Sequence, residues 1–211
     1  MIKNILFDLD NTLYSALSPI NSGITRRMKE FVVNFLNLPE EECLRQREEG
    51  IKKYGSTLNW LRNEKKLKDP ESFFSFVHPE SETTELIPDT NLKPFLQSLP
   101  YNKGILTNSP LEHALRVLDF YGIRDLFSGI YDLRINNFNG KPYPAAYKRA
   151  LEGLGFAVSE TIFIDDSPRY LDGFTKLGGA VLLVDEFSKY RETPYPKVKT
   201  IYSIPEILKN L

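Results

Sequence analysis

The chain has 211 residues, and its 27 lysines and arginines nearly balance its 28 acidic residues, which leaves a formal net charge of −1. A hydrophobic content of 41% excludes an intrinsically disordered chain, and the balanced charge excludes a protein that binds nucleic acid through a basic surface. We also expect no membrane segment and no signal peptide, because apolar runs are short and acids interrupt the first one. The single cysteine, Cys43, predicts a reducing, cytoplasmic compartment.

The first predicted element is a strand at 2–9, which is apolar and ends in carboxylates. Further strands are predicted at 104–107, 128–132, 161–164, 180–184 and, at an edge, 197–202. Helices are predicted from Leu111 towards Gly122, over 144–154 and over 168–177. Continuously apolar strands are typical of a parallel sheet that helices cover on both faces. The alternation of strands and helices therefore predicts an α/β, doubly wound, Rossmann-like fold.

The segment 15–87 interrupts this alternation, because it contains no convincing strand. Helices are expected from Pro19 with Ser18 as N-cap, from about 40 to 54, over 59–66 and over 70–77. A connection of roughly 70 residues is too long for a simple crossover. We therefore predict a small helical domain at 15–87, inserted after the first strand of a core formed by 1–14 and 88–211.

Polar side chains follow several of the predicted strands, at the sheet edge where open parallel sheets bind their ligands. They are Asp8 and Asp10, then Thr107, Asn108 and Ser109, then Lys141, and finally Asp165 and Asp166. Four carboxylates in one crevice repel one another, and a divalent cation removes that repulsion. Oxygen ligands suit Mg²⁺, whereas zinc is not expected because neither His nor Cys lies at these ends.

These residue types suit the transfer of a phosphoryl group. Asp8 is the candidate nucleophile, because a carboxylate can form an aspartyl-phosphate, and Asp10 lies close enough to exchange a proton with the leaving group. Thr107 and Lys141 offer a hydroxyl and a cation to the phosphate. Asn108 or Ser109 is expected to cap the following helix and to aim its N-terminus at the phosphate.

The same residues resemble the four ordered motifs of the haloacid dehalogenase-like hydrolases. The motifs are DLDNT at 8–12, Thr107 at the end of ILT, Lys141 in GKPYP and the acid pair in FIDDSP. The resemblance implies that Asp8 is phosphorylated and that Asp10 is the acid/base. It also implies that Mg²⁺ is held by the Asp8 side chain, the Asp10 backbone carbonyl and one or both of Asp165 and Asp166. Thr107, Asn108 and Lys141 are then the phosphate-binding residues, and the helical segment resembles the family's cap domain.

Two finer points follow from the resemblance. The dehalogenases of the family lack an acid/base Asp at the position of Asp10, which favours phosphate chemistry here. The run DNTLY and the helical cap are most similar to the pyrimidine 5′-nucleotidase branch. The predicted function is therefore Mg²⁺-dependent hydrolysis of a small phosphorylated metabolite, such as a nucleoside 5′-monophosphate.

Other functions stay open at this point. A sugar-phosphate phosphatase or a phosphomutase needs the same residues, and a phospho-acceptor signalling domain shares an acidic pocket with Thr and Lys. The sequence predicts no nucleic-acid or membrane partner and leaves the oligomeric state open. His78 and His113 are expected on helix surfaces, and Cys43 is expected to be half-buried.

Overall fold

The computed structural model describes residues 1–209, and the chain divides into two compact units. The first unit, called here the sheet unit, comprises Met1–Leu17 and Pro88–Leu211. The second, called the helical unit, is Ser18–Ile87. The boundary between the first segment of the sheet unit and the helical unit lies after Leu17, three residues beyond the position 14 expected from the sequence. Each unit is described by itself.

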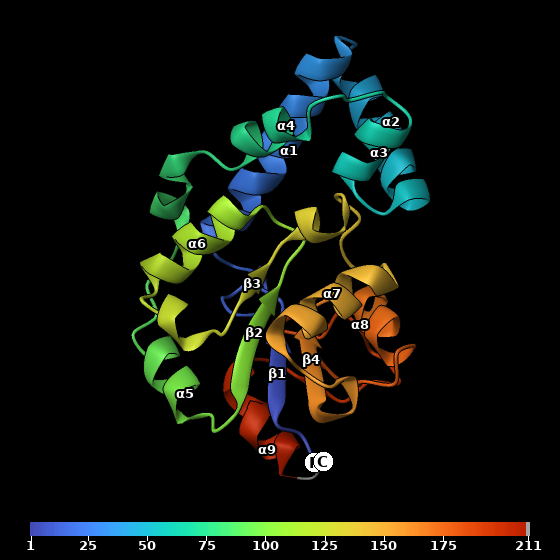
Figure 1. The fold of residues 1–211 in the computed structure, drawn as a ribbon. Helices are drawn as coiled ribbons and strands as arrows, with labels where there is room; N and C mark the ends of the chain where they lie inside the picture. Colours follow the sequence, from blue (N-terminus) through green and yellow to red (C-terminus); the bar gives the residue numbers. More distant parts are fainter. Residues whose placement is uncertain (210–211) are drawn as a thin grey trace. The chain divides into compact units, whose positions relative to one another are not determined.

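The sheet unit is built on six parallel strands in the order β3-β2-β1-β4-β5-β6. The strands are β1 (Asn4–Phe7), β2 (Asn102–Leu106), β3 (Ile130–Tyr131), β4 (Thr161–Asp165), β5 (Ala180–Val184) and β6 (Lys197–Val198). Figure 1 shows β1 between β2 and β4, and in the register Phe7 lies beside Ile105 on one side and Ile164 on the other. The α/β fold with a parallel sheet and a helical insertion after β1 is confirmed.

The two outer strands are shorter than predicted, because side chains end them. After β3, the Asp132 carboxylate accepts a hydrogen bond from Arg134 N and starts a short 3₁₀ helix. After β6, the Thr200 hydroxyl accepts a hydrogen bond from Tyr202 N and likewise starts a short 3₁₀ helix. Such local side-chain bonds compete with the strand ladder.

Helices cover the sheet, and the α7 and α8 pair encloses the main core. The helices of this unit are α5 (Leu92–Ser98), α6 (Leu111–Phe120), α7 (Pro144–Leu154), α8 (Pro168–Thr175) and α9 (Ile204–Leu208). Leu6 of β1 and Phe163 of β4 are buried against Tyr147 of α7 and Phe174 of α8. Phe7 points to the opposite face, as strand alternation requires, and meets Phe127 edge-on at a centroid distance of 6.2 Å.

The helical unit contains α1 (Pro19–Leu36), α2 (Glu40–Tyr54), α3 (Thr57–Asn63) and α4 (Pro70–Val77). Ser18 precedes α1 but does not cap it; its hydroxyl donates to the Glu85 carbonyl at 3.2 Å. The α2 and α3 helices approach closely at Gly50, where a Cβ atom would lie 2.2 Å from Cγ of the buried Trp60. Cys43 is fully buried, not half-buried as expected, because it packs inside this small core.

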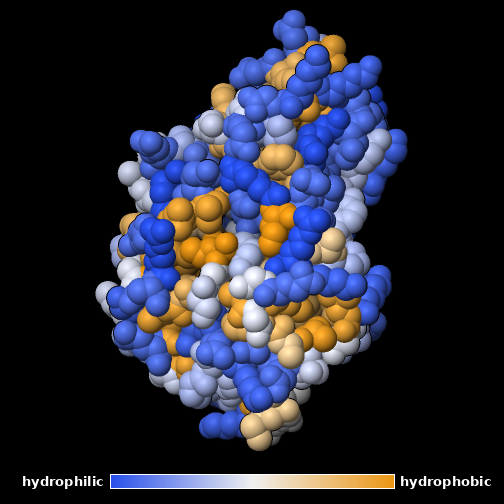
Figure 2. Space-filling model, viewed as in Figure 1, coloured by the Kyte–Doolittle hydropathy of each residue, from blue (hydrophilic) through white to orange (hydrophobic). Residues whose placement is uncertain are grey.

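The face visible in Figure 2 is mainly hydrophilic, with apolar groups between the polar ones. Exposed aromatic side chains of the described chain include Phe187 and Tyr143, with 45% and 44% of their surface exposed. None of the helices within residues 1–209 is both long enough and apolar enough to cross a membrane.

Candidate active site

The end of β1 places two aspartates in one tight turn. Asp8 still follows the strand, because its N–H donates to the Ile164 carbonyl of β4 at 2.9 Å. The Leu9 carbonyl then accepts from Leu13 N at 2.9 Å, and Asn11 has a φ of 61°, a left-handed conformation that asparagine tolerates. Asp8 and Asp10 therefore leave the same strand end but meet different neighbours.

Asp8 belongs to an acid cluster, defined here as Asp8, Asp165, Asp166 and the cation of Lys141. The Lys141 Nζ atom lies 2.6 Å from Asp8 Oδ1 and 2.6 Å from Asp165 Oδ2. The Lys141 side chain is 1% exposed, so this cation is shared between two buried carboxylates. Ligand oxygens of Asp8, Asp165 and Asp166 lie within 4.8 Å of one another.

Burial and mutual repulsion make this cluster costly to ionise. Burial raises the pKa of Asp8, although Lys141 opposes the shift, and it raises the pKa of Asp165 well above its ordinary value. Burial, followed by repulsion from Asp8, raises the pKa of Asp166 to about 7. The pKa of Lys141 is raised despite its burial, because Asp165 and Asp8 favour the charged ammonium.

Asn108 and two aromatic rings hold Lys141 in place. The Asn108 amide accepts from Lys141 N at 2.7 Å and donates to the Lys141 carbonyl at 2.9 Å. The ammonium lies 5.0 Å from the Tyr170 ring centroid and 5.3 Å from that of Phe163. The Asn108 side chain, predicted to bind phosphate, is thus engaged in positioning the loop that carries Lys141.

Asp10 lies in a different set, called here the donor cluster, with Tyr14, Ser109 and His113. The Ser109 hydroxyl donates to Asp10 Oδ2 at 2.5 Å, and the Tyr14 hydroxyl donates to Asp10 Oδ1. His113 Nε2 lies 2.8 Å from Asp10 Oδ1. The prediction that His113 lies on a helix surface is wrong, because its face of α6 turns inward and leaves none of its surface exposed. His78, also expected on a surface, is buried against Glu82 at 3.0 Å.

These donors favour the ionised form of Asp10. Burial alone would raise its pKa, but the charge and hydrogen bond of His113, with the hydroxyls of Ser109 and Tyr14, hold the pKa well below its usual range. The Tyr14 hydroxyl pKa is raised well above its ordinary value by burial and by the adjacent Asp10 carboxylate.

The end of β2 joins the two clusters. Thr107 is buried, and its hydroxyl accepts from Ser109 N at 3.0 Å, which leaves the hydroxyl proton for a further acceptor. Neither Asn108 nor Ser109 caps α6, contrary to the prediction, because both side chains have the partners described above. Asp132 of the β3 end accepts from Leu111 N at 3.0 Å instead. The sequence placed Asp132 as the last residue of the predicted strand at 128–132 and gave no other signal of this role.

The acid cluster fits a hard divalent cation. It offers carboxylate oxygens from Asp8, Asp165 and Asp166, the ligand type that Mg²⁺ prefers, and a cation would relieve the repulsion that raises the pKa of Asp166. The Asp10 carboxylate is occupied by its donors, so Asp10 could contribute only its backbone carbonyl to such a site.

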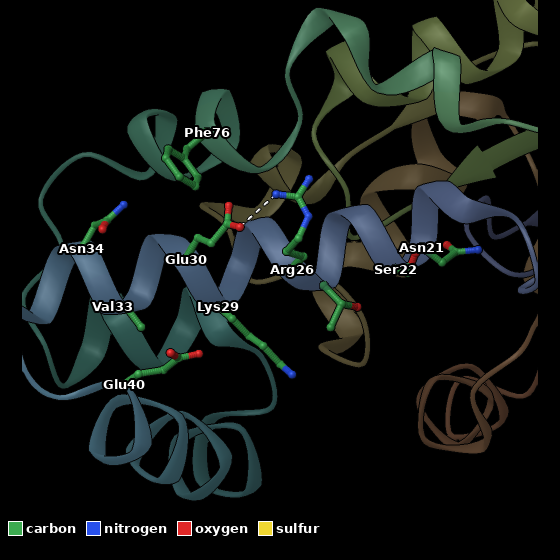
Figure 3. A pocket seen from close by; sticks show the side chains of 10 residues that line it. Asn21, Ser22, Arg26, Lys29, Glu30, Val33, Asn34, Glu40 and Phe76 are labelled. Carbon is green, nitrogen blue, oxygen red and sulfur yellow. Dashed lines mark hydrogen bonds and ion pairs between the residues drawn. The ribbon is translucent and has the colours of Figure 1, made fainter.

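A separate hollow of about 770 Å³ lies along α1 in the helical unit. Figure 3 shows its lining, which includes the exposed Arg26 and Glu30 pair, Lys29 and Phe76. None of the side chains predicted to act on phosphate lines this hollow. The candidate active site is therefore the carboxyl edge of the sheet.

Residues 2–178 match the family model described as haloacid dehalogenase-like hydrolase. The chain belongs to the haloacid dehalogenase-like hydrolases. The match covers the first strand, the helical insertion and the strand ends that carry both clusters. The family resemblance predicted from the four motifs is thus confirmed.

The curated relatives of this chain include two phosphatases whose names state their substrates. Phosphate metabolism protein 8 of Saccharomyces cerevisiae is 28% identical, and the alignment covers 89% of this chain but only 63% of that protein. A phosphoglycolate phosphatase of Haemophilus influenzae is 28% identical over 85% of this chain and 84% of its own. A glyceraldehyde 3-phosphate phosphatase of Methanocaldococcus jannaschii is 24% identical, and the alignment covers 100% of this chain and 99% of that protein. None of these three names includes a nucleotidase, so the narrower resemblance gains no support from them.

Solved structures show the same fold. A haloacid dehalogenase-like phosphatase from Thermococcus onnurineus aligns with a TM-score of 0.68 at 21% identity and covers 98% of each chain. The hydrolase YfnB from Bacillus subtilis, solved with bound magnesium, aligns with a TM-score of 0.62 at 17% identity over 99% of each chain. Likeness at this identity concerns the fold alone.

Proposed function

We propose that this haloacid dehalogenase-like hydrolase is a Mg²⁺-dependent phosphatase that acts on small phosphomonoesters through a phosphorylated aspartate. The observation that carries the proposal is the acid cluster. One ammonium lies 2.6 Å from each of two buried carboxylates, at the sheet edge where the family resemblance places its nucleophile.

In the first step, an Asp8 carboxylate oxygen attacks the phosphorus, and the bond from phosphorus to the leaving oxygen breaks. The leaving oxygen takes a proton from Asp10, and an acyl phosphate remains on Asp8. Lys141 orients Asp8 and, with the Thr107 hydroxyl, offers positive charge and a donor to the phosphoryl oxygens.

In the second step, a water attacks the phosphorus of the aspartyl-phosphate, and Asp10, now a carboxylate, takes the proton of that water. The bond between phosphorus and Asp8 breaks, which releases phosphate and restores Asp8. The donors around Asp10 favour the carboxylate that this second step needs, and the proton taken from the water is the one that Asp10 gives to the leaving oxygen of the next substrate.

Asp8, Asp165 and Asp166 would hold the magnesium ion, together with the backbone carbonyl of Asp10. When bound, the ion supplies charge that offsets the phosphate and the acid cluster. The magnesium-bound YfnB structure supports this assignment by analogy of fold.

The substrate is proposed to be a small phosphorylated carboxylic acid, aldehyde or sugar. The names of the phosphoglycolate and glyceraldehyde 3-phosphate phosphatases support this class. It corresponds to the sugar-phosphate alternative that the sequence left open, and it takes precedence over a nucleoside 5′-monophosphate.

A substrate panel tests the proposal. We expect release of inorganic phosphate, over many turnovers and with Mg²⁺, from 2-phosphoglycolate, glyceraldehyde 3-phosphate or a hexose phosphate, faster than from nucleoside monophosphates. Faster turnover of nucleotides would overturn the substrate class. Isomerised sugar phosphate without phosphate release would identify a phosphomutase instead, and a single turnover without release would indicate a signalling domain.

A further inference from the structure

Both carboxylate oxygens of Asp10 are engaged by donors from different parts of the sheet unit. Tyr14 follows β1 in the chain, whereas Ser109 and His113 follow β2 and lie about a hundred residues further on. About a fifth of the Asp10 side chain, 21%, stays exposed. Asp10 is therefore accessible and yet fixed in orientation.

The direction of the histidine bond follows from the chemistry of its partner. When Asp10 is a carboxylate it accepts hydrogen bonds, and the ring nitrogen 2.8 Å from its Oδ1 is then the donor. In that state of Asp10, His113 carries a hydrogen on Nε2, the atom that faces the carboxylate.

The α6 segment supports all three donors. Ser109 lies two residues before α6 and His113 lies in its first turn, and both side chains contact Asp10. Tyr121 directly follows α6, and its ring stacks on Tyr14 with centroids 6.3 Å apart and planes at 25°. The α6 helix and its flanking residues therefore carry or contact all three donors.

We infer that His113 is a positioning residue for proton transfer by Asp10, and that it acts from α6 together with the Tyr14 and Ser109 hydroxyls. The hydrogen bond from Nε2 fixes the Asp10 carboxylate in the orientation from which it exchanges a proton with the leaving oxygen. This inference rests on the proposed phosphatase function and deepens it, because it names the residues that govern one of the two carboxylates.

A positioning role has a specific kinetic consequence. A basic leaving oxygen needs the Asp10 proton as its bond to phosphorus breaks, whereas a weakly basic nitrophenolate leaves without it. Loss of the His113 bond should therefore slow esters with basic leaving groups most. A merely structural defect would slow all esters by the same factor.

The experiment compares phenyl phosphate with p-nitrophenyl phosphate, two probes of similar shape that differ in the basicity of the leaving group. With Mg²⁺ present, His113→Leu should lower kcat/KM for phenyl phosphate by about 100-fold and for p-nitrophenyl phosphate by less than about tenfold. His113→Gln keeps an N–H donor and should lose less than His113→Leu. Asp119→Asn, on the exposed side of α6, is the matched control and should behave as the unmodified protein.

A second measurement covers the case in which His113→Leu folds poorly. Tyr14→Phe removes one donor and keeps the ring, so it should show the same preference for the better leaving group. In an Asp10→Ala background, His113→Gln should cause no further loss, because its partner is gone. Equal losses with both substrates, or full additivity with Asp10→Ala, would overturn the inference.

The unmodified protein and Asp8→Asn separate this inference from the proposed function. If neither phosphate ester is hydrolysed by the unmodified protein, the phosphatase proposal fails and the inference fails with it. If Asp8 is essential but His113 variants match the unmodified protein with both esters, only the role of His113 is rejected.

Discussion

Asp8 and Asp10 lie two residues apart in one turn, yet the fold gives them opposite environments. Asp8 shares an ammonium with a second buried acid and has a raised pKa, whereas Asp10 is surrounded by donors and has a lowered one. The difference shows how one strand end can supply two carboxylates with different roles. The two acids are chemically identical. The difference comes from their neighbours: Tyr14 after β1, Ser109 after β2, His113 of α6, Lys141 of the loop before α7, and Asp165 of β4.

The largest expected effect comes from removing the nucleophile on the Asp8 side of this comparison. Asp8→Asn keeps the size of the side chain and should lower turnover by at least about a thousandfold, because a neutral amide does not attack phosphorus. Phosphate release from p-nitrophenyl phosphate measures the loss, and circular dichroism checks the fold. Normal turnover by this variant would show that the two aspartates have been assigned the wrong roles.

Removal of the metal should act on the acid cluster and spare the donor cluster. EDTA is expected to abolish turnover and added Mg²⁺ to restore it, because three carboxylates of the cluster lie close enough together to hold one divalent cation. Isothermal titration calorimetry should detect Mg²⁺ binding that Asp166→Asn weakens and Asp119→Asn leaves unchanged. Turnover that is indifferent to EDTA would remove the metal from the mechanism.

The stability of the metal-free protein should depend on pH through Asp166. Its pKa of about 7 in the folded protein exceeds the ordinary 3.8, so folding favours the protonated acid. This stabilisation is present at low pH and is lost as the pH rises from about 4 to 7. In EDTA, Asp166→Asn should therefore raise the thermal midpoint above that of the unmodified protein at pH 8, and the two should converge near pH 4. A difference that is constant with pH would contradict the raised pKa.

The smallest effect concerns the helix that carries the donor cluster. Asp132→Ala removes the acceptor for Leu111 N and should cost about 1 kcal/mol of unfolding free energy. Because α6 also carries His113, turnover of phenyl phosphate should fall slightly while Mg²⁺ binding stays unchanged. Urea denaturation and calorimetry measure the two effects. A weakened Mg²⁺ affinity would show that the clusters are coupled more tightly than their separate contacts indicate.

Much of the fold could be predicted from local patterns. The bounds of β5 and α7 agree with the predicted 180–184 and 144–154, because continuous apolar runs and a terminal Pro and Gly mark them. The short β3 and β6 could not be delimited, since single side chains, Asp132 and Thr200, end them through hydrogen bonds. Their apolar residues alone carried no signal for those ends.

For the candidate site, the sequence by itself determined which acids, hydroxyls and lysine stand at the strand ends, because motif and strand end coincide in the chain. Only the tertiary structure decided how they pair. The buried His113 comes to Asp10 from a distant segment, and Asn108 supports Lys141, because the parallel order β2-β1-β4 brings those strand ends together. The sequence pattern of an amphipathic helix does not show whether a histidine on it faces solvent or a carboxylate. The packing of the helix against the rest of the sheet unit decides which of the two it is.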